Sequence, residues 1–444
     1  MANVVFISPQ ADAINVLSRN EQTGFYPPLG ILYLGAMIKD LCDIYTIDAQ
    51  FGRYTVDQIV EATAKVQPDV VGISVSFIPT VRNALLIAEG IKKANGNSTI
   101  VLGGNAATFL ADKLIQKTGV DIVVLKEGEM TFRDCVRALL EKKPISGIPG
   151  IVYKENNEVK KNEFTQYIEN LDELPFPLYE QLPDHKKYLK AIMSSRGCLY
   201  ECIYCSTKAM WQKWRARSAE NLIAEIQHIM SNYPDERKSI NFADDNFVVD
   251  KKRVTHFIEL LKRENIAISW GFSARIEMMD DAMLPRLREA NCRRIYFGIE
   301  SGSDRILKYL KRHYTADYVK DKVNKCIQAG ILPTVSFMLG MPWEREEDVM
   351  DTFRLMQDVN TPFVQCSIFT PVIGTPLHTN PEKYNMKIFD HSVEEECTDT
   401  GKVFHATEHL SAERIYQLWL EGQGICGLRL NEYQSYTDYF RSKT

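Results

Sequence analysis

The segment 195–205 places three thiols close together, at Cys198, Cys202 and Cys205. Their spacing is C-x3-C-x2-C, and the aromatic Tyr204 directly precedes the last of them. Cysteine thiolates ligate [4Fe–4S] clusters, and three ligands on one loop leave the fourth iron open for a small molecule to chelate. Structural zinc sites instead favour C-x2-C pairs completed by a second pair or by histidines at matching distances. The loop therefore predicts a three-cysteine cluster site, with a zinc site or three ordinary buried thiols as the alternatives.

The elements around this loop follow a regular alternation of apolar strands with helices or turns from about residue 191 onward. We predict six strands, at Ala191–Ser194, Ser239–Phe242, Ile268–Phe272, Arg294–Gly298, Thr334–Met338 and Phe363–Ile368. The cysteine loop then directly follows the first strand. In barrels built from such units the chemistry lies at the carboxyl ends of the strands, so the loop stands where a reactive centre is expected.

Residues 190 to about 380 resemble the core of the radical S-adenosylmethionine (SAM) superfamily. The three cysteines match its cluster motif, Tyr204 matches the aromatic residue that lies against adenine, and six strand–helix units match its partial (β/α)6 barrel. The resemblance implies that the open iron binds the amino and carboxylate groups of SAM. It also implies one-electron cleavage of SAM to methionine and a 5′-deoxyadenosyl radical, with the protein orienting the cofactors that carry this chemistry.

Polar side chains follow the strands of this predicted barrel. Asp244 and Asp245 come after the second strand, where the alternatives are capping of the next helix and contact with the SAM ammonium group or a substrate donor. Arg275, after the third strand, is a candidate for the SAM carboxylate, because a guanidinium pairs with a carboxylate through two hydrogen bonds. Glu300, after the fourth, is a candidate for the ribose hydroxyls or the amino group. The segment 339–344 resembles the glycine-proline turn of the family.

Residues 1 to about 140 repeat the strand–helix alternation as a separate α/β unit. Continuous apolar strands are predicted at Val4–Ser8, Ile44–Asp48, Val70–Ser74, Thr99–Gly103 and Ile122–Leu125. Helices are predicted at Gly30–Lys39, Val56–Val66, Val81–Lys93, Phe109–Lys117 and Thr131–Glu141. Five such strands predict a doubly wound, flavodoxin-like (Rossmann-like) sheet, whose ligand lies beyond the carboxyl ends of the strands.

This amino-terminal unit resembles the cobalamin-binding domain that precedes the barrel in one large class of radical SAM enzymes. The segments that carry the resemblance are 26–34, 71–76, 102–108 and 127–129. Their glycines permit close approach of a planar macrocycle or its nucleotide tail. The cofactor-binding residues implied by the resemblance are Pro28, Leu29, Ser74, Ser76, Gly103, Gly104, Thr108, Glu127, Gly128 and Glu129. The alternative is a nucleotide-binding or ligand-free Rossmann-like domain, although no G-x-G-x-x-G follows the first strand.

Histidine is absent from residues 1–150. The D-x-H-x-x-G motif that supplies an axial imidazole in other cobalamin domains is therefore missing, as is common in the radical SAM class. The frequent G-G-x-H-x-T motif is also altered, to Gly-Gly-Asn-Ala-Ala-Thr at 103–108. We expect any cobalamin in this domain to bind base-off and without a histidine ligand.

The chain is expected to have two main domains joined by a linker. The predicted organisation is a cobalamin-binding domain at 1–141, a linker at 142–188, a radical SAM barrel at 189–380 and a C-terminal extension at 381–444. Prolines and glycines punctuate the linker, within which we expect a hairpin around Ile151–Val159. One helix is expected near Ala412–Gly422 in the extension.

The composition argues against several other classes of protein. A hydrophobic content of 45% with 25% charged residues is that of a globular protein, and the net charge of −5 argues against a nucleic-acid surface. The sequence contains no run of about 18 apolar residues, so no membrane span is predicted. The first residues are predicted to form a strand rather than a signal peptide. Ten cysteines, three of them clustered, fit a reducing cytoplasm better than a disulfide framework.

The leading hypothesis is a cobalamin-dependent radical SAM methyltransferase acting on an unactivated carbon or phosphorus of a small-molecule biosynthetic intermediate. SAM would serve twice, methylating the cobalt to give methylcobalamin and supplying the radical. The expected partners are the substrate and an external electron donor such as flavodoxin or ferredoxin. The alternatives are radical cyclisation, ring contraction or oxidation, methylthiolation of RNA or a ribosomal protein, and non-enzymatic cobalamin or iron–sulfur sensing. Methylthiolation needs a second cluster, for which Cys42 and Cys135 supply too few ligands.

Overall fold

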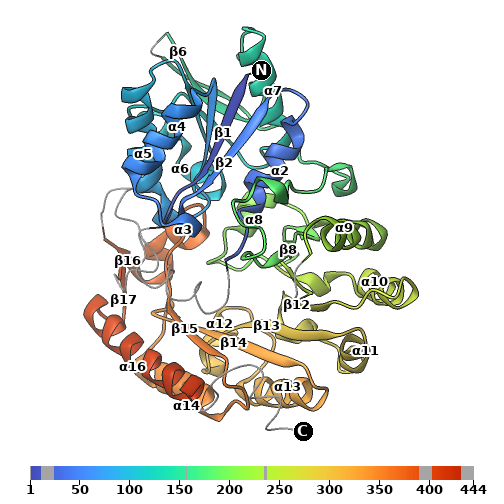
Figure 1. Cartoon of the computed structure of the whole chain (residues 1–444). Helices are drawn as coiled ribbons and strands as arrows, with labels where there is room; N and C mark the ends of the chain where they lie inside the picture. Colours follow the sequence, from blue (N-terminus) through green and yellow to red (C-terminus); the bar gives the residue numbers. More distant parts are fainter. Residues whose placement is uncertain (1, 12–24, 157, 235–237, 390–402, 432–444) are drawn as a thin grey trace. The chain divides into compact units, whose positions relative to one another are not determined.

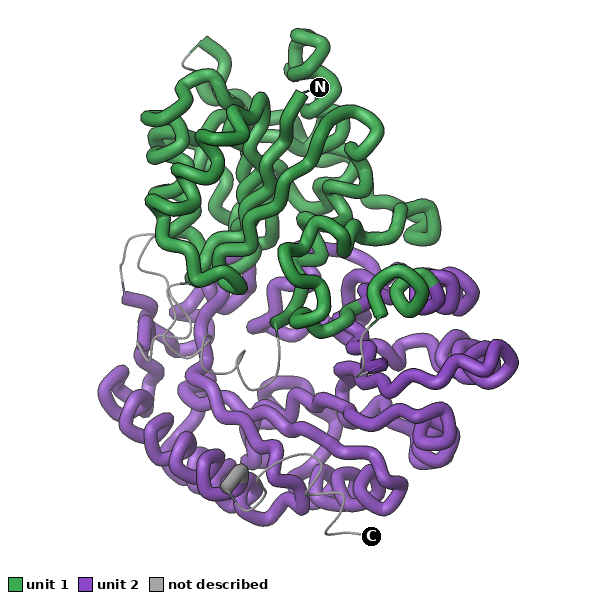
Figure 2. The backbone as a smooth tube through the Cα atoms, viewed as in Figure 1, with its two compact units in different colours: residues 1–191, 228–234, 391–400 green, residues 192–227, 235–390, 401–444 purple. Residues whose placement is uncertain are grey.

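The computed structural model of the chain describes residues 2–11, 25–156, 158–234, 238–389 and 403–431. The chain divides into two compact units (Figure 2). Unit 1 comprises residues 1–191, 228–234 and 391–400, and unit 2 comprises residues 192–227, 235–390 and 401–444. No helix within the described ranges is long and apolar enough to cross a membrane.

The sheet of unit 1 confirms the five predicted parallel strands. They are β1 (Asn3–Ser8), β2 (Asp43–Asp48), β3 (Val70–Ser74), β4 (Thr99–Gly103) and β5 (Ile122–Val124). Their order is β2-β1-β3-β4-β5, and each neighbouring pair is parallel, which is the flavodoxin-like arrangement. The predicted hairpin is present as β6 (Ile151–Glu155) and β7 (Glu158–Asn162). It extends the same sheet beyond β5 in antiparallel pairing.

Helices cover the sheet of unit 1, and the predicted helices are confirmed (Figure 1). α2 (Leu29–Ile38) packs against α7 (Glu129–Leu140), and α4 (Val56–Val66) packs against α5 (Val81–Ala94). Two further helices are α3 (Ala49–Gly52) and α6 (Asn105–Leu114). The prediction for α6 was displaced, because this helix begins at Asn105, directly after the Gly104 turn, rather than at Phe109.

One core of unit 1 lies between the sheet, α2 and α7. It contains alternate strand residues such as Val4, Phe6 and Val101, together with Phe132 and Val136 of α7. The side chains of these five residues are buried. Burial of apolar surface stabilises such a core by about 25 cal/mol per Å², so the strand ends that carry the polar motifs are held by a rigid base.

The main sheet of unit 2 contains six strands in chain order. They are β8 (Lys190–Ile192), at which the chain passes from unit 1 into unit 2, then β11 (Ser239–Phe242), β12 (Ser269–Ala274), β13 (Cys292–Glu300), β14 (Leu332–Leu339) and β15 (Val364–Ile368). The strands from β11 to β15 pair in parallel with their neighbours. Helices alternate with them, including α9 (Ala219–Asn232), α10 (Lys251–Arg263), α11 (Met283–Glu289), α12 (Asp304–Tyr309), α13 (Ala316–Gln328) and α14 (Glu346–Asp358) (Figure 1). This is the predicted partial (β/α)6 barrel.

An aromatic cluster fixes β11 and β12 relative to α10. The ring centroids of Phe242 and Phe247 lie 4.5 Å apart, and Trp270 lies 5.4 Å from Phe257 of α10. The Trp270 indole donates to the Ala290 carbonyl at 2.7 Å. Aromatic pairs contribute about 0.5–1.5 kcal/mol each beyond their burial, so this cluster holds the two strands from which the carboxylates and Arg275 project.

The described C-terminal elements pack within unit 2. β16 (Met386–Ile388) pairs antiparallel with β17 (His405–Thr407). α16 (Ala412–Asn431) confirms the helix predicted near Ala412–Gly422 and extends it. This helix contacts β15 and α14 (Figure 1), and Gln423 donates to the Cys366 carbonyl of β15 at 2.5 Å.

Candidate active site and cofactor-binding residues

The cysteine loop (residues 198–205) lies between two short antiparallel strands, β9 (Ser195–Arg196) and β10 (Arg215–Ala216), and is followed by α8 (Thr207–Trp211). Gly197 begins the turn with φ of +87°, and a Cβ at this position would lie 2.5 Å from the Lys213 carbonyl oxygen. Glycine is therefore required, because any side chain would collide with backbone. Within the loop, the Cys205 amide donates to the Cys202 carbonyl at 3.1 Å.

The three thiols of the loop form a donor set that fits a cluster. Cys198, Cys202 and Cys205 are free and half-buried, whereas Cys42, Cys135, Cys292, Cys326 and Cys366 are free and buried in the two cores. Burial raises the pKa of Cys198 and Cys205, so a bound cation is needed to keep their sulfurs as thiolates. No three His, Cys, Asp or Glu side chains in the described ranges converge on a single metal ion. A [4Fe–4S] cube needs no such convergence, since each thiolate ligates a different iron.

Asp244 is committed to holding the strand before the cysteine loop. Its carboxylate accepts from the Ser194 hydroxyl at 2.7 Å, and from both the hydroxyl (3.0 Å) and the amide of Ser195. Asp244 is only 5% exposed. This burial raises the pKa of its carboxyl group, although the hydrogen bonds from the serines oppose the shift. Arg253 of α10 donates to the Ser194 carbonyl at 3.1 Å and completes the network.

Asp245, the next residue in the loop after β11, is exposed, whereas Asp244 is buried. Its carboxylate accepts from the Thr207 hydroxyl at 3.3 Å, and that hydroxyl lies 3.2 Å from the Cys205 sulfur. The helix-capping alternative for this pair of carboxylates is wrong. α10 is capped by Asp250, which accepts from the amides of the first helical turn at 2.9 and 3.0 Å.

Arg275 lies directly against the cysteine loop. Its Nη1 is 3.4 Å from the Cys202 sulfur, and its guanidinium carbon stands 3.6 Å from the centroid of the Tyr200 ring. Its Nε donates to Glu277 at 2.7 Å. The sequence motif located Arg275, but neither Tyr200 nor Glu277 was predicted. Tyr200 lies between the first two cysteines of the motif, and that position was the only available signal for it.

Glu300 ends β13 with φ of +75°, in the left-handed region that a non-glycine residue seldom adopts. Its carboxylate accepts from the Tyr204 hydroxyl at 3.2 Å and is ion-paired with the buried Arg312. Arg312 also donates to the Tyr204 hydroxyl, so Tyr204, Glu300 and Arg312 form one hydrogen-bonded triad beside the cysteine loop. Sequence reasoning missed Arg312, which lies outside every strand-end motif.

Two buried side chains, Glu344 and His405, hold the turn after β14. The sequence indicates the segment 339–344, which contains Glu344, but not His405. Glu344 accepts from the amides of Gly340 and Met341 at 2.6 and 3.2 Å, and burial raises its pKa to about 8. His405, at the start of β17, donates from Nε2 to the Gly340 carbonyl at 2.8 Å. Burial lowers the pKa of His405 to about 4. Neither the second oxygen of Glu344 nor Nδ1 of His405 has a hydrogen-bond partner within the described structure.

In unit 1, the structure brings the predicted residues of β3 and β4 together at the carboxyl edge of the sheet. The hydroxyls of Ser74 and Ser76 are 2.9 Å apart, and the Val75 amide donates to the Gly103 carbonyl at 2.7 Å. Gly104 turns away with φ of +110°, where a Cβ would lie 2.9 Å from the Val75 backbone. This edge presents half-buried hydroxyls beside bare glycine backbone, a donor set that fits a large planar ligand bearing amide groups.

The remaining predicted residues of unit 1 lie in the turns after β4 and β5 or at helix starts. Thr108 donates to the Gly104 carbonyl at 3.0 Å and accepts from the Lys126 amide at 2.8 Å, which ties the turn after β4 to the turn after β5. Glu127 is buried and accepts from the Ile168 amide at 2.7 Å. The other four stand at helix starts: Pro28 and Leu29 at α2, and Gly128 and Glu129 at α7.

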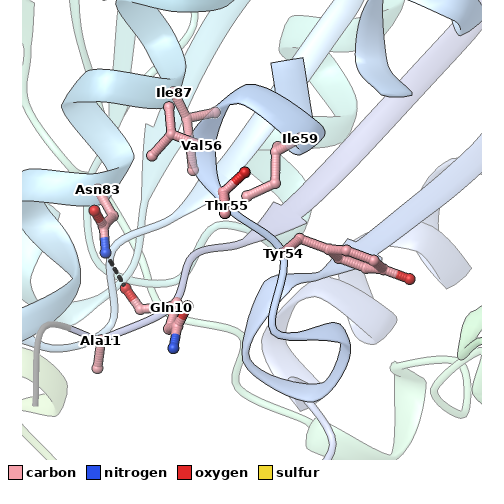
Figure 3. Close-up of a pocket in the computed structure, with 8 residues that line it drawn as sticks. All are labelled: Gln10, Ala11, Tyr54, Thr55, Val56, Ile59, Asn83 and Ile87. Atoms are coloured by element: carbon pink, nitrogen blue, oxygen red, sulfur yellow. Dashed lines mark hydrogen bonds between the residues drawn. The ribbon is translucent and has the colours of Figure 1, made fainter. Parts of the chain in front are cut away.

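A cavity of about 280 Å³ opens beside the carboxyl end of β1 (Figure 3). The Asn83 amide donates to the Gln10 carbonyl across it at 2.9 Å. The lining residues come from the chain after β1, the start of α4 and the start of α5, and are Gln10, Ala11, Tyr54, Thr55, Val56, Ile59, Asn83 and Ile87. None of them was a predicted cofactor residue.

Two family models match this chain. The radical SAM superfamily model matches residues 192–356, and the B12 binding domain model matches residues 19–136. An uncharacterised methyltransferase of Pyrococcus horikoshii is 34% identical over 358 residues, which cover 79% of this chain and 77% of the relative. The anaerobic magnesium-protoporphyrin IX monomethyl ester cyclase of Rubrivivax gelatinosus is 24% identical over 371 residues, which cover 79% of this chain and 65% of that protein.

Solved structures show the same fold. TsrM, a radical SAM methyltransferase of Kitasatospora setae with cobalamin and a [4Fe–4S] cluster bound, matches with a TM-score of 0.72 at 17% identity. The match covers 88% of this chain and 81% of TsrM. With both domain models matched and a methyltransferase relative aligned over most of its length, the chain belongs to the cobalamin-dependent radical SAM methyltransferase family.

Proposed function

We propose that this enzyme methylates an unactivated carbon or phosphorus of a small-molecule biosynthetic intermediate, with SAM as the methyl source. Residues 1–141 would bind cobalamin, residues 189–380 would bind the cluster and SAM, and the segments 142–188 and 381–444 would serve as linker and extension. The observation that carries the proposal is the cysteine loop. It presents three free, half-buried thiols beside a triad that holds Tyr204.

In this proposal Cys198, Cys202 and Cys205 ligate the cluster. When bound, the cluster, SAM and cobalamin supply an electron, a 5′-deoxyadenosyl radical and a methyl carrier. Asp245 is the better of the two carboxylates for the SAM ammonium group, since it is exposed and Asp244 is occupied by Ser194 and Ser195.

The SAM nucleoside would lie against Tyr204 and Glu300. Arg312 holds both groups in place before any ligand arrives. A preset partner lowers the ordering cost of binding. Arg275 remains a candidate for the SAM carboxylate, although Glu277 and Cys202 already engage its guanidinium.

Cobalamin would bind at the carboxyl edge of the sheet in unit 1. The proposed contacts are Pro28, Leu29, Ser74, Ser76, Gly103, Gly104, Thr108, Glu127, Gly128 and Glu129. Supplying hydroxocobalamin during expression tests this proposal, and we expect a stoichiometric corrinoid whose cob(II)alamin spectrum lacks nitrogen hyperfine coupling from a protein imidazole. Purification without corrinoid, or a spectrum with imidazole coupling, would contradict it.

The cluster assignment is tested by anaerobic reconstitution with iron and sulfide. We expect one [4Fe–4S] cluster per chain and release of 5′-deoxyadenosine from SAM under reduction. The triple variant Cys198→Ala, Cys202→Ala, Cys205→Ala should lose both, whereas Cys426→Ala, a half-buried thiol outside the loop, should keep both. A triple variant that still holds the cluster and cleaves SAM would refute the assignment of these three cysteines as cluster ligands.

The reaction type is tested with SAM labelled in its methyl group. Methyl transfer predicts that candidate substrates gain one labelled carbon, with S-adenosylhomocysteine formed alongside 5′-deoxyadenosine. The second candidate, radical cyclisation or oxidation, is favoured by the cyclase relative that aligns over 79% of this chain. It predicts loss of hydrogens from the substrate and no label. Corrinoid binding without SAM cleavage would instead favour a sensor.

We also propose a cytoplasmic location and an external one-electron donor such as flavodoxin or ferredoxin. Nine described cysteines are free of disulfides, which suits a reducing compartment. Reduced flavodoxin should then replace dithionite in the SAM-cleavage assay.

A further inference from the structure

The guanidinium of Arg275 contacts a thiol of the cysteine loop. Its Nη1 lies 3.4 Å from the Cys202 sulfur, and the residue is 8% exposed. Cys205 has a neutral neighbour instead, the Thr207 hydroxyl at 3.2 Å. The buried Arg275 therefore places a full positive charge beside one of the three half-buried sulfurs.

The orientation of Arg275 is fixed from two further sides. Glu277 accepts from its Nε at 2.7 Å and is ion-paired with its Nη2, and the Tyr200 ring stacks on its flat face at 3.6 Å. A planar guanidinium can make all three contacts at once, whereas the ammonium group of a lysine cannot. Glu277 takes the edge of the guanidinium formed by Nε and Nη2. The remaining nitrogen, Nη1, is therefore directed toward Cys202.

We propose that Arg275 is a positioning residue that raises the reduction potential of the cluster through Cys202, an inference that rests on the proposed cluster site. Hydrogen bonds to the ligating sulfurs and the local net charge set the potential of such clusters. Addition of one electron makes the cluster more negative, so a nearby cation stabilises the reduced state more than the oxidised one. Glu277 moderates this effect, because its carboxylate offsets part of the guanidinium charge.

The two partners therefore have effects of opposite sign. Arg275→Met removes the cation and should lower the potential. Glu277→Gln removes the anion, leaves the guanidinium uncompensated and should raise the potential. A general loosening of the loop would not shift the potential in opposite directions in the two variants, so the pair of signs separates an electrostatic role from a merely structural one.

The experiment is an anaerobic redox titration of the reconstituted full-length protein, with the reduced cluster quantified by electron paramagnetic resonance. At a fixed potential, Arg275→Met should lower the ratio of reduced to oxidised cluster about tenfold, which is about 59 mV for a one-electron couple. Glu277→Gln should raise that ratio several-fold, and Arg275→Lys should fall between Arg275→Met and the wild type. Arg286→Met is the matched control and should leave the ratio unchanged, because it removes an exposed arginine of α11 that is paired with Glu259 of α10.

The outcomes separate this inference from the proposed function. A wild-type protein without iron, sulfide or the cluster signal would overturn the proposed function itself. Loaded variants whose ratios all agree with the wild type would overturn the role of Arg275 and leave the cluster site intact. If Arg275→Met does not retain its cluster, the test rests on Glu277→Gln. A ratio of reduced to oxidised cluster that falls or stays constant in Glu277→Gln refutes the inference.

Discussion

Glu344 should make the stability of unit 2 decrease as the pH rises through the neutral range. The carboxyl group is fully buried, and its pKa is raised from 4.5 to about 8. In the unfolded chain the group ionises near its ordinary value, so between these two pKa values the native state binds more protons than the unfolded state. The stabilising contribution is therefore complete below pH 4.5 and is lost as the pH rises through about 8.

The size of this effect follows from the two pKa values. His405 has its own shift, downward from 6.5 to about 4, and it adds stability as the pH rises between those values. The unfolded histidine is half protonated at pH 6.5 and nearly neutral by pH 8, so between these values His405 makes only a small opposing contribution. Comparison with Glu344→Gln, which keeps His405, isolates Glu344. With 1.36 kcal/mol per pKa unit, the native state loses roughly 1.5 kcal/mol across this window. For a unit of this size that corresponds to a decrease of about 3–6 °C in melting temperature.

The assay is thermal unfolding followed by tryptophan fluorescence at several pH values. All five tryptophans (Trp211, Trp214, Trp270, Trp343 and Trp419) lie in unit 2, so the signal reports that unit. The wild type should lose this stability relative to Glu344→Gln, which cannot ionise and should have a flatter profile. Glu347→Gln, an exposed change on the following helix, should track the wild type. Parallel profiles for wild type and Glu344→Gln between pH 6.5 and 8 would refute the reasoning.

Three further predictions concern the site residues. Gly104→Ala should lower corrinoid retention and destabilise unit 1, because the extended positive-φ conformation at this position (φ of +110°, ψ of 179°) costs an alanine about 1–3 kcal/mol and its Cβ would meet the Val75 backbone. Corrinoid content and proteolysis of unit 1 test this. Asp244→Asn should lower the melting temperature reported by tryptophan by the equivalent of about 1–3 kcal/mol, whereas Asp245→Asn should leave it unchanged and weaken SAM binding in calorimetry. Arg312→Met should weaken SAM binding about tenfold or more, because Glu300 loses its buried cation.

The fold could be predicted from the sequence because its signals are local and repeated. Continuous apolar runs such as Val70–Ser74 require burial on both faces, and helices between them require parallel pairing. The observed parallel pairing of β1 to β5 follows from that alternation. The start of α6 was displaced because the backbone turns at Gly104 with positive φ and the helix begins directly after it, at Asn105.

The partners of the site residues were harder to predict because they are distant in sequence. Arg312 reaches Tyr204 across 108 positions, and His405 reaches Gly340 across 65. Neither residue belongs to a spaced motif, and a single arginine or histidine in a helix-rich segment predicts an exposed side chain. Only the folded chain brings these groups to the carboxyl ends of β13 and β14.

The two adjacent carboxylates after β11 show how the fold divides roles that the sequence leaves equivalent. Both residues lie in the loop that follows β11, and their different hydrogen-bond partners separate their roles. Asp244 faces inward, where Ser194 and Ser195 consume its hydrogen-bonding capacity, and it fixes the strand that begins the cysteine loop. Asp245 is exposed and is linked to Cys205 through the Thr207 hydroxyl. The inner carboxylate therefore places the sulfurs, and the outer one is left available for a cationic ligand near them.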